Sequence, residues 1–143
     1  MKKFLLMLAL IVPMLAFTGC GGDDDEQQGA TLNKTKWAMA SIGGAQYAYN
    51  VFEFKSSSFE CYTADSNLTP LGDITNGTYS MNGNDVNFNG FVMRTSIFQE
   101  VKFDKGIING NKIVFNVKFR AFDPDDKTGE WHDWPNPITL IKR

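Results

Sequence analysis

Two glutamates of this chain could form an acid–base pair. Glu53 and Glu60 lie in alternating segments that flank the turn residues Ser56 and Ser57, so a hairpin would bring the two carboxylates together. A pair of this kind can act as acid and base in glycoside hydrolysis. Strand carboxylates beside lysines are far commoner, and we therefore predict that the protein is not an enzyme.

Other catalytic and metal-binding residue types are scarce. The chain has one histidine, His132, and shows no Cys/His metal spacing, phosphate-binding glycine loop or nucleophile motif. The segment 123–130 supplies closely spaced oxygen ligands, but Lys127 lies among its acids and the order differs from that of an EF-hand. An ordinary solvated turn is favoured there, and no metal site or cofactor is predicted.

Trp131 and Trp134 lie in the proline-containing segment 131–137, which we expect to be a loop. Aromatic side chains at a loop tip can stack on sugar rings, cover the mouth of a barrel or anchor a protein partner. The simpler alternative is that one or both fold back and close one end of the domain.

The two cysteines have different surroundings. Cys61 lies in the alternating segment 59–63, where a cysteine usually serves as a small buried apolar residue. We predict a buried, unreactive thiol at this position. Cys20 instead follows a charged start at Lys2 and Lys3 and a near-continuous apolar run over residues 4–17. That order predicts a secretory signal over residues 1–19, because the run is too short for a comfortable membrane span.

The junction Leu15-Ala16-Phe17-Thr18-Gly19-Cys20 resembles the lipobox of bacterial lipoproteins. The resemblance implies that Cys20 becomes the first residue of the mature chain and carries fatty acyl chains such as palmitate, which hold it in a membrane. Ordinary secretion with an unmodified Cys20 is the alternative.

Residues 20–30 contain four adjacent acids and no large apolar side chain, which is typical of an extended, flexible tether. An acidic run so close to the cysteine is similar to the surface-export signal of lipoproteins in certain Gram-negative gut anaerobes. The similarity implies display on the cell surface of the outer membrane, and a tether on the periplasmic face is the alternative.

The remaining residues, 31–143, predict one domain with no net charge. The whole chain has 14 Lys and Arg and 16 Asp and Glu, and removing Lys2, Lys3 and the four tether acids leaves 12 of each. A neutral domain lacks the basic surface of a nucleic-acid-binding protein. Its length allows a genuine hydrophobic core without several disulfides.

This domain is predicted to be all-β. Alternating apolar and polar residues, bounded by turn residues, predict about eight strands in the segments 35–42, 46–54, 58–64, 77–81, 84–88, 97–103, 113–119 and 138–142. Asn82-Gly83 and Asn109-Gly110 are strong hairpin signals. The predicted order is an up-and-down antiparallel barrel, and the alternative is a two-sheet β-sandwich.

An eight-stranded barrel is either filled by its own side chains or holds one small ligand. Several phenylalanines are bulky enough to fill it, namely Phe52, Phe54, Phe88, Phe115 and Phe119. A filled barrel would bind through its loops, whereas a hollow one would be a carrier.

Four segments resemble small lipocalin-like lipoproteins: residues 32–37, the hairpin that begins with Gly77-Thr78-Tyr79, the hairpin at 108–113, and the closing residues 139–143. Trp37 matches the family's tryptophan near the first strand, and Thr35 stands where the family has a glycine. The opening residues 32–44 also resemble the first strand of META-type heat-shock lipoprotein domains, which is the rival family.

The lipocalin-like resemblance implies a non-enzymatic binding lipoprotein that takes a small apolar or amphipathic ligand. The alternative is an interaction module that binds a glycan or a protein partner through the loop containing Trp131 and Trp134. The candidate ligand- or partner-binding residues are Trp37, Phe52, Phe54, Phe115, Trp131 and Trp134. The sequence does not determine the oligomeric state.

Overall fold

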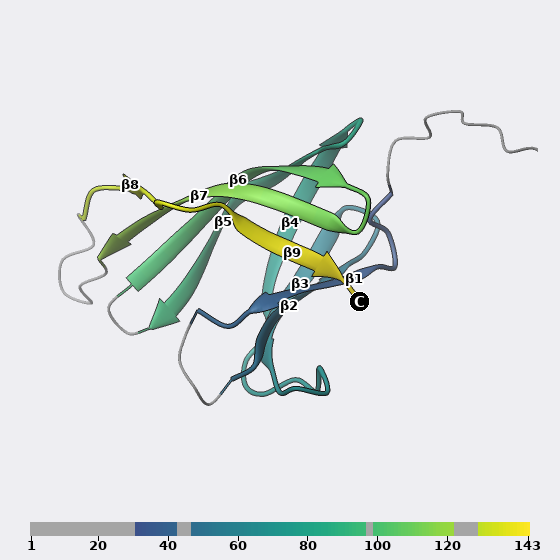
Figure 1. Ribbon diagram of the computed structural model, residues 1–143, viewed down its shortest axis with the longest axis horizontal. Helices are drawn as coiled ribbons and strands as arrows, with labels where there is room; N and C mark the ends of the chain where they lie inside the picture. The colour runs from purple at the N-terminus through teal and green to yellow at the C-terminus, as the bar shows by residue number, and fades with distance from the viewer. Residues whose placement is uncertain (1–30, 43–46, 97–98, 122–128) are drawn as a thin grey trace, which may run out of the picture.

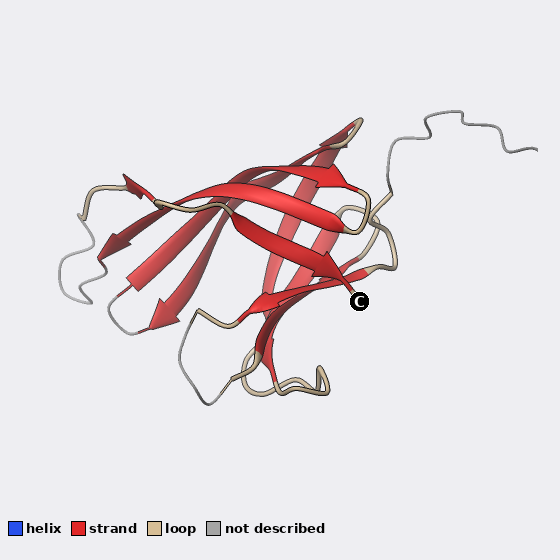
Figure 2. Ribbon diagram, in the orientation of Figure 1, coloured by secondary structure: helices blue, strands red, loops and turns tan. Residues whose placement is uncertain are grey.

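A computed structural model of the chain describes residues 31–42, 47–96, 99–121 and 129–143. The predicted signal peptide, the predicted lipidation site Cys20, the predicted tether and most of the segment 123–130 lie outside the described residues. Figure 2 shows that the described part consists of strands and loops. In this part of the chain no helix is long and apolar enough to cross a membrane.

The described residues form nine strands in antiparallel order (Figure 1). Their bounds are β1 Lys36–Ala40, β2 Tyr49–Phe54, β3 Ser58–Ala64, β4 Thr75–Asn82, β5 Asp85–Ser96, β6 Gln99–Asn109, β7 Lys112–Ala121, β8 His132–Asp133 and β9 Ile138–Lys142. Each of the first seven strands pairs with the next one, and β9 pairs with both β7 and β1. The sheet therefore closes into the eight-stranded, up-and-down barrel predicted from the sequence, with one extra strand, and the sandwich alternative is wrong.

The extra strand arises because the last strand of the barrel is interrupted. β9 pairs with the first half of β7, whereas β8 pairs with its second half, at Lys118 and Phe119. Pro135 and Pro137 lie between β8 and β9, and a proline has no N–H to donate to a ladder. The segment 131–137 is thus only partly a loop, which corrects the expectation from sequence: His132 and Asp133 are strand residues.

The two hairpins predicted at Asn82-Gly83 and Asn109-Gly110 are confirmed. Asn82 pairs with Asp85 across the β4–β5 turn. Only Gly83 in that turn has a positive φ, of 59°, as expected for a type II′ turn with glycine first. Gly110 plays the same part in the β6–β7 turn, at φ 58°. The sequence did not indicate that β5 continues beyond Phe88 to Ser96.

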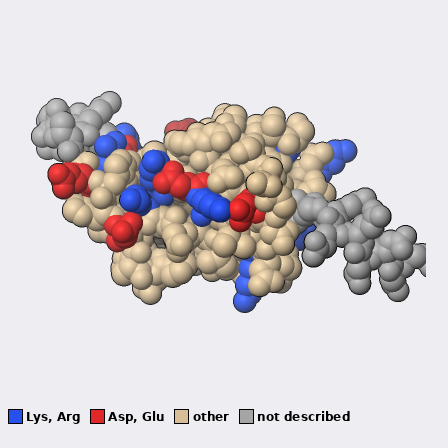
Figure 3. Space-filling model, turned by 90° about the horizontal axis from the view of Figure 1, so that it is seen from above, with Lys and Arg blue, Asp and Glu red and all other residues tan. Residues whose placement is uncertain are grey.

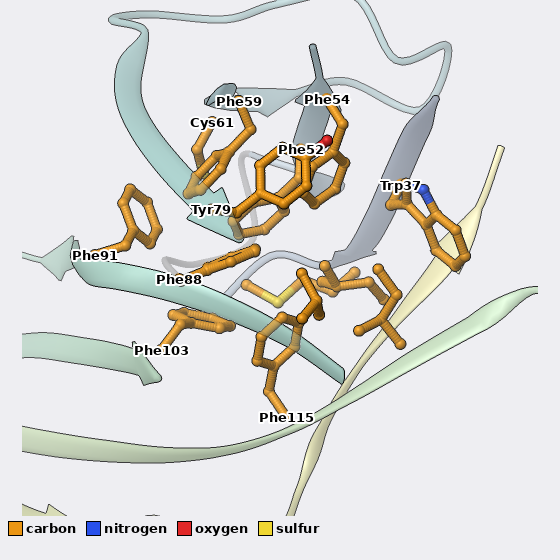
Figure 4. Close-up of a cluster of buried hydrophobic side chains, with 14 of the residues drawn as sticks. Trp37, Phe52, Phe54, Phe59, Cys61, Tyr79, Phe88, Phe91, Phe103 and Phe115 are labelled. Atoms are coloured by element: carbon orange, nitrogen blue, oxygen red, sulfur yellow. The ribbon is translucent and has the colours of Figure 1, made fainter. Parts of the chain in front are cut away.

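Aromatic side chains fill the interior of the barrel, as Figure 4 shows. Phe52 and Phe59 on one wall face Phe88 and Phe103 on the other, and the Phe59 and Phe88 rings stack at 4.3 Å. A buried phenylalanine removes a large apolar area from water, and ring pairs add a further stabilisation of about 1 kcal/mol each. The barrel is therefore built around a packed aromatic core.

The two ends of the barrel differ. One end gathers the short turns β2–β3, β4–β5 and β6–β7, together with the entry to β1 and the carboxyl terminus (Figure 1). Backbone hydrogen bonds join these segments, from Lys34 N–H to the Phe54 carbonyl and from Arg143 N–H to the Lys36 carbonyl, each at 2.9 Å. The opposite end carries the longer connections, including the loop of residues 65–74 between β3 and β4.

Candidate functional site

A cleft of about 580 Å³ opens at the end of the barrel that carries the longer connections. We call it the mouth cleft. It lies between β2 and β3 on one side and β5 on the other, and the β3–β4 loop forms its third wall. Its lining residues are Tyr47, Asn50, Cys61, Tyr62, Thr63, Leu71, Gly72, Asp73, Thr75, Met93, Arg94 and Thr95. Cavities of this volume are typical of small-molecule sites.

Two sulfur-containing side chains form the floor of the mouth cleft. Cys61 and Met93 are 4 % and 6 % exposed, and the Cys61 Sγ lies 4.0 Å from the Met93 Sδ. Burial raises the pKa of the Cys61 thiol to about 12, because a thiolate there would lose its hydration. The prediction of a buried thiol is confirmed, and the floor is apolar and adaptable in shape.

The walls of the mouth cleft carry neutral polar groups that the fold holds in place. The Asn50 side chain is 6 % exposed, and its Oδ1 accepts a hydrogen bond of 3.2 Å from the Ile42 N–H. On the neighbouring strand β3, Thr63 donates its hydroxyl to the Leu71 carbonyl, and the Leu71 N–H donates back to the Thr63 carbonyl at 2.8 Å. These paired bonds fix the β3–β4 loop against β3.

The β3–β4 loop has its own internal support. The Asp65 carboxylate accepts hydrogen bonds from the backbone N–H groups of Asn67 and Thr69, at 2.8 and 2.9 Å. The bonds from Thr69 and Asn67 lower the pKa of Asp65, since they favour its charged form. Leu68, at φ 63°, packs on the outer cluster that contains Val51 and Tyr62. The loop is therefore an ordered wall.

The chemistry of the mouth cleft is amphipathic. A thiol and a thioether lie at its base, tyrosines and hydroxyl groups line its walls, and the charged groups are Asp73 and Arg94. Such a lining suits a ligand with an apolar body and a polar end. Among the described residues, no group of three or more His, Cys, Asp or Glu side chains could hold a metal ion.

The aromatic site residues predicted from the sequence lie elsewhere. Phe52, Phe54 and Phe115 are at most 1 % exposed, and their surfaces are taken up by neighbouring core side chains. Trp37 is 2 % exposed and donates its indole N–H to the Thr35 hydroxyl at 2.8 Å. None of the four lines the mouth cleft, and a role for them in ligand binding stays a prediction.

Trp131 and Trp134 both pack against the barrel. The Trp134 ring meets the Phe119 ring edge-on at 5.3 Å, next to the main core. The Arg120 guanidinium lies over the Trp131 ring, with its Cζ atom 4.5 Å from the ring centroid. Both indoles are half-buried, and neither lines the mouth cleft.

The same Arg120 belongs to a row of charged side chains on the outer face of β5, β6 and β7. Glu100 lies at the centre of the row, 8 % exposed, with Arg120 at 2.8 Å and Arg94 at 3.6 Å. Figure 3 shows acidic and basic side chains side by side on this face. Charges of opposite sign neutralise one another there, so the face has no large field of one sign.

The two glutamates that could form an acid–base pair do face each other. Glu53 and Glu60 are cross-strand partners in the β2–β3 ladder, as the sequence predicted. Each is bound by a lysine: Lys36 lies 3.1 Å from Glu53, and Lys55 contacts Glu60. The Tyr62 hydroxyl also donates to Glu53 at 3.3 Å. These contacts show a solvated ion-pair cluster on the outer surface.

The mouth cleft itself was not identified from the sequence. Cys61 was assigned to the core, and no motif singled out Met93, Thr95 or Leu71, because their convergence depends on strands far apart in the chain. Comparison of the chain with protein-family models, with curated proteins and with solved structures finds no match.

Proposed function

We propose that this protein is a lipid-anchored, non-enzymatic binding protein of the outer membrane, displayed at the cell surface, and that its mouth cleft takes a small amphipathic molecule. The observation that carries the proposal is the cleft of about 580 Å³ between β3, the β3–β4 loop and β5. The anchor is inferred from the sequence around Cys20.

The packing of the barrel supports a site at the mouth in place of a site inside. Phe52, Phe59 and Phe103 have no exposed surface, and their ring centroids lie 5.7 Å apart in the Phe52–Phe59 and Phe52–Phe103 pairs. Displacing such rings would forfeit well-packed apolar contacts. A ligand can enter the mouth cleft without this cost, because Cys61 and Met93 already border it.

The position at which the chain leads into β1 supports the same function. Residue 31 precedes β1 at the end of the barrel that carries the short turns (Figure 1). The residues that line the mouth cleft lie at the opposite end. A tether over residues 20–30 spans at most about 40 Å when fully extended. A protein anchored at Cys20 would thus present its mouth cleft away from the membrane.

Native mass spectrometry tests the proposal directly. The full chain, purified from its host in mild detergent, should carry an additional small molecule that is released on denaturation. Leu71→Trp should abolish this extra mass, because Leu71 lines the mouth cleft and a larger side chain there occupies the ligand's volume. Leu71→Ala is the matched control, and it should retain the ligand. Ligand retention by Leu71→Trp would contradict the proposed site.

The second candidate is an interaction module that binds a glycan or a protein partner around Trp131 and Trp134. It is supported by the exposure of His132 and Asp133 between the two indoles. In this case Leu71→Trp would leave binding unchanged, whereas Trp131→Ala would weaken it.

A further inference from the structure

A second opening lies in the wall of the barrel, where β4 and β5 separate. The two strands pair only at the turn end, from Tyr79 with Phe88 to Asn82 with Asp85. Beyond that point a groove of about 520 Å³ lies between them, and we call it the seam groove. Its lining residues are Ser58, Thr75, Asn76, Gly77, Thr78, Asn89, Gly90, Phe91 and Val92. It is distinct from the mouth cleft, although Thr75 borders both.

A bend in β5 holds the seam groove open. Gly90 has φ 69°, a conformation that glycine adopts at little cost. The β5–β6 register shifts between Asn87 and Phe91 at the same place. An irregularity of this kind bends a strand and ends its pairing on one side. The Asn89 side chain then reaches across the groove and donates to the Thr78 hydroxyl at 3.2 Å.

The walls of the seam groove are two strand edges. Thr75–Thr78 pair with β3 on one side, and within the described residues no strand pairs with them on the other. Phe91 and Val92 likewise pair only with β6 among the described strands. A strand edge presents a row of backbone N–H and C=O groups, which is a template for another extended chain. The closed barrel thus keeps two edges that face a single groove.

The side chains of the seam groove indicate the charge of its ligand. They are hydroxyl, amide and apolar groups, and no residue that lines the groove is charged. A charged ligand would lose hydration there without gaining a counter-ion. Glycan binding usually relies on an accessible aromatic ring, and the one ring in the lining, that of Phe91, is only 5 % exposed.

We propose that the seam groove binds an extended, uncharged peptide segment, which adds to the edges of β4 and β5 through main-chain hydrogen bonds. Because β4 and β5 run in opposite directions, a strand in the seam groove lies antiparallel to one of them and parallel to the other. Main-chain bonds supply the affinity, and alternate side chains of the peptide pack on the partly exposed Val92. This site goes beyond the proposed function, since it takes a different class of ligand at a different place.

The test uses a pool of uncharged six-residue peptides rich in Thr, Val, Ile and Tyr, incubated with the full chain. The blocking variant is Thr78→Cys with Asn89→Cys, because these side chains already meet across the seam groove. Oxidation should join the two cysteines and close the groove, and reduction should reopen it. Thr78→Arg is a second blocking variant, which needs no disulfide and places a charge in the groove.

The unchanged protein should retain a subset of the peptides. The oxidised double-cysteine variant and the Thr78→Arg variant should each bind that subset at least about tenfold more weakly. Reduction of the double variant should restore binding. N-methylation of alternate backbone amides in a retained peptide should abolish binding. The proposal would be overturned if the unchanged protein retained no peptide, or if the blocked proteins retained the peptides equally well. It would also be overturned if the N-methylated peptide bound equally well, or if neutral oligosaccharides bound in place of peptides. Leu71→Trp should leave peptide binding unchanged, which separates this site from the mouth cleft.

Discussion

The packing of Phe59 on Gly77 gives the sharpest test of the aromatic core. Gly77 lies on β4, and a Cβ atom placed there would lie 2.2 Å from the Phe59 Cζ and 2.7 Å from both Cε atoms. Carbon atoms in contact prefer a separation of about 3.5–4.0 Å. To accept an alanine at position 77, the Phe59 ring would therefore have to move by about 1.5 Å.

The surroundings of Phe59 oppose that movement. Its ring is fully buried, stacks on Phe88 at 4.3 Å and meets Phe91 edge-on at 4.9 Å. Overpacking a dense core costs about 1–3 kcal/mol. Replacing glycine by alanine also restricts the unfolded chain, which offsets the loss by about 0.4–1 kcal/mol. We expect Gly77→Ala to lower the free energy of unfolding by about 2 kcal/mol.

Urea unfolding of the full chain, followed by tryptophan fluorescence, measures this change. With an m-value of about 1.5 kcal/mol/M, a loss of about 2 kcal/mol shifts the midpoint by roughly 1.3 M. Asn76→Ala, at an exposed position in the same strand, is the control and should shift it little. In a Phe59→Leu background, Gly77→Ala should cost less, because the ring that it meets is absent. Equal costs in both backgrounds, or no loss of stability at all, would refute the packing argument.

Three further predictions concern Cys61, Glu100 and the two tryptophans of segment 131–137. Burial raises the pKa of Cys61 from 9.0 to about 12, so the folded protein keeps a proton that the unfolded chain releases above about pH 9. Stability should therefore be unaffected by this group below pH 9 and should fall by up to about 4 kcal/mol between pH 9 and pH 12, and urea titrations should show a shallower fall for Cys61→Ala. Glu100→Ala should lower the free energy of unfolding by about 2 kcal/mol, because it removes the partly buried carboxylate that lies 2.8 Å from Arg120 and 3.6 Å from Arg94, and a double-mutant cycle with Arg120→Ala that gives no coupling would contradict this. Trp134→Ala should lower the free energy of unfolding by about 2 kcal/mol, through lost packing on the core, whereas Trp131→Ala should lower it by about 0.5–1 kcal/mol, through loss of its cation–π contact with Arg120. If both tryptophan variants also leave every binding event unchanged in native mass spectrometry, the interaction-module alternative fails.

Local sequence patterns were sufficient to predict most of the strands, because the alternation of apolar and polar residues within a strand indicates which of its faces is buried. Phe52 and Phe54 alternate with Val51 and Glu53, and the structure places the phenylalanines inside and Glu53 outside. Turn chemistry added the hairpins, since Gly83 and Gly110 supply the positive φ that a two-residue turn needs. The pairing of Glu53 with Glu60 followed from the same reasoning.

Local sequence patterns did not predict strands whose formation depends on pairing with a distant part of the barrel. His132 and Asp133 form a strand because they pair with Phe119 and Lys118 in the second half of β7. The two prolines that follow them in the sequence indicated a loop instead. The continuation of β5 past Gly90 is likewise decided by its pairing with β6, at Phe91 and Val92. Neither pairing can be read from a short window of residues.

The sequence by itself determined the fold class: an all-β architecture, antiparallel strands in chain order, and aromatic side chains enough to fill its core. These properties depend on composition and on contacts between neighbours along the chain. Only the tertiary structure decided that the core is packed, that Cys61 meets Met93 at the mouth, and that β4 and β5 part to leave a groove. Such features depend on closure of the sheet, which brings together residues that are distant in the chain and whose separation no local pattern encodes.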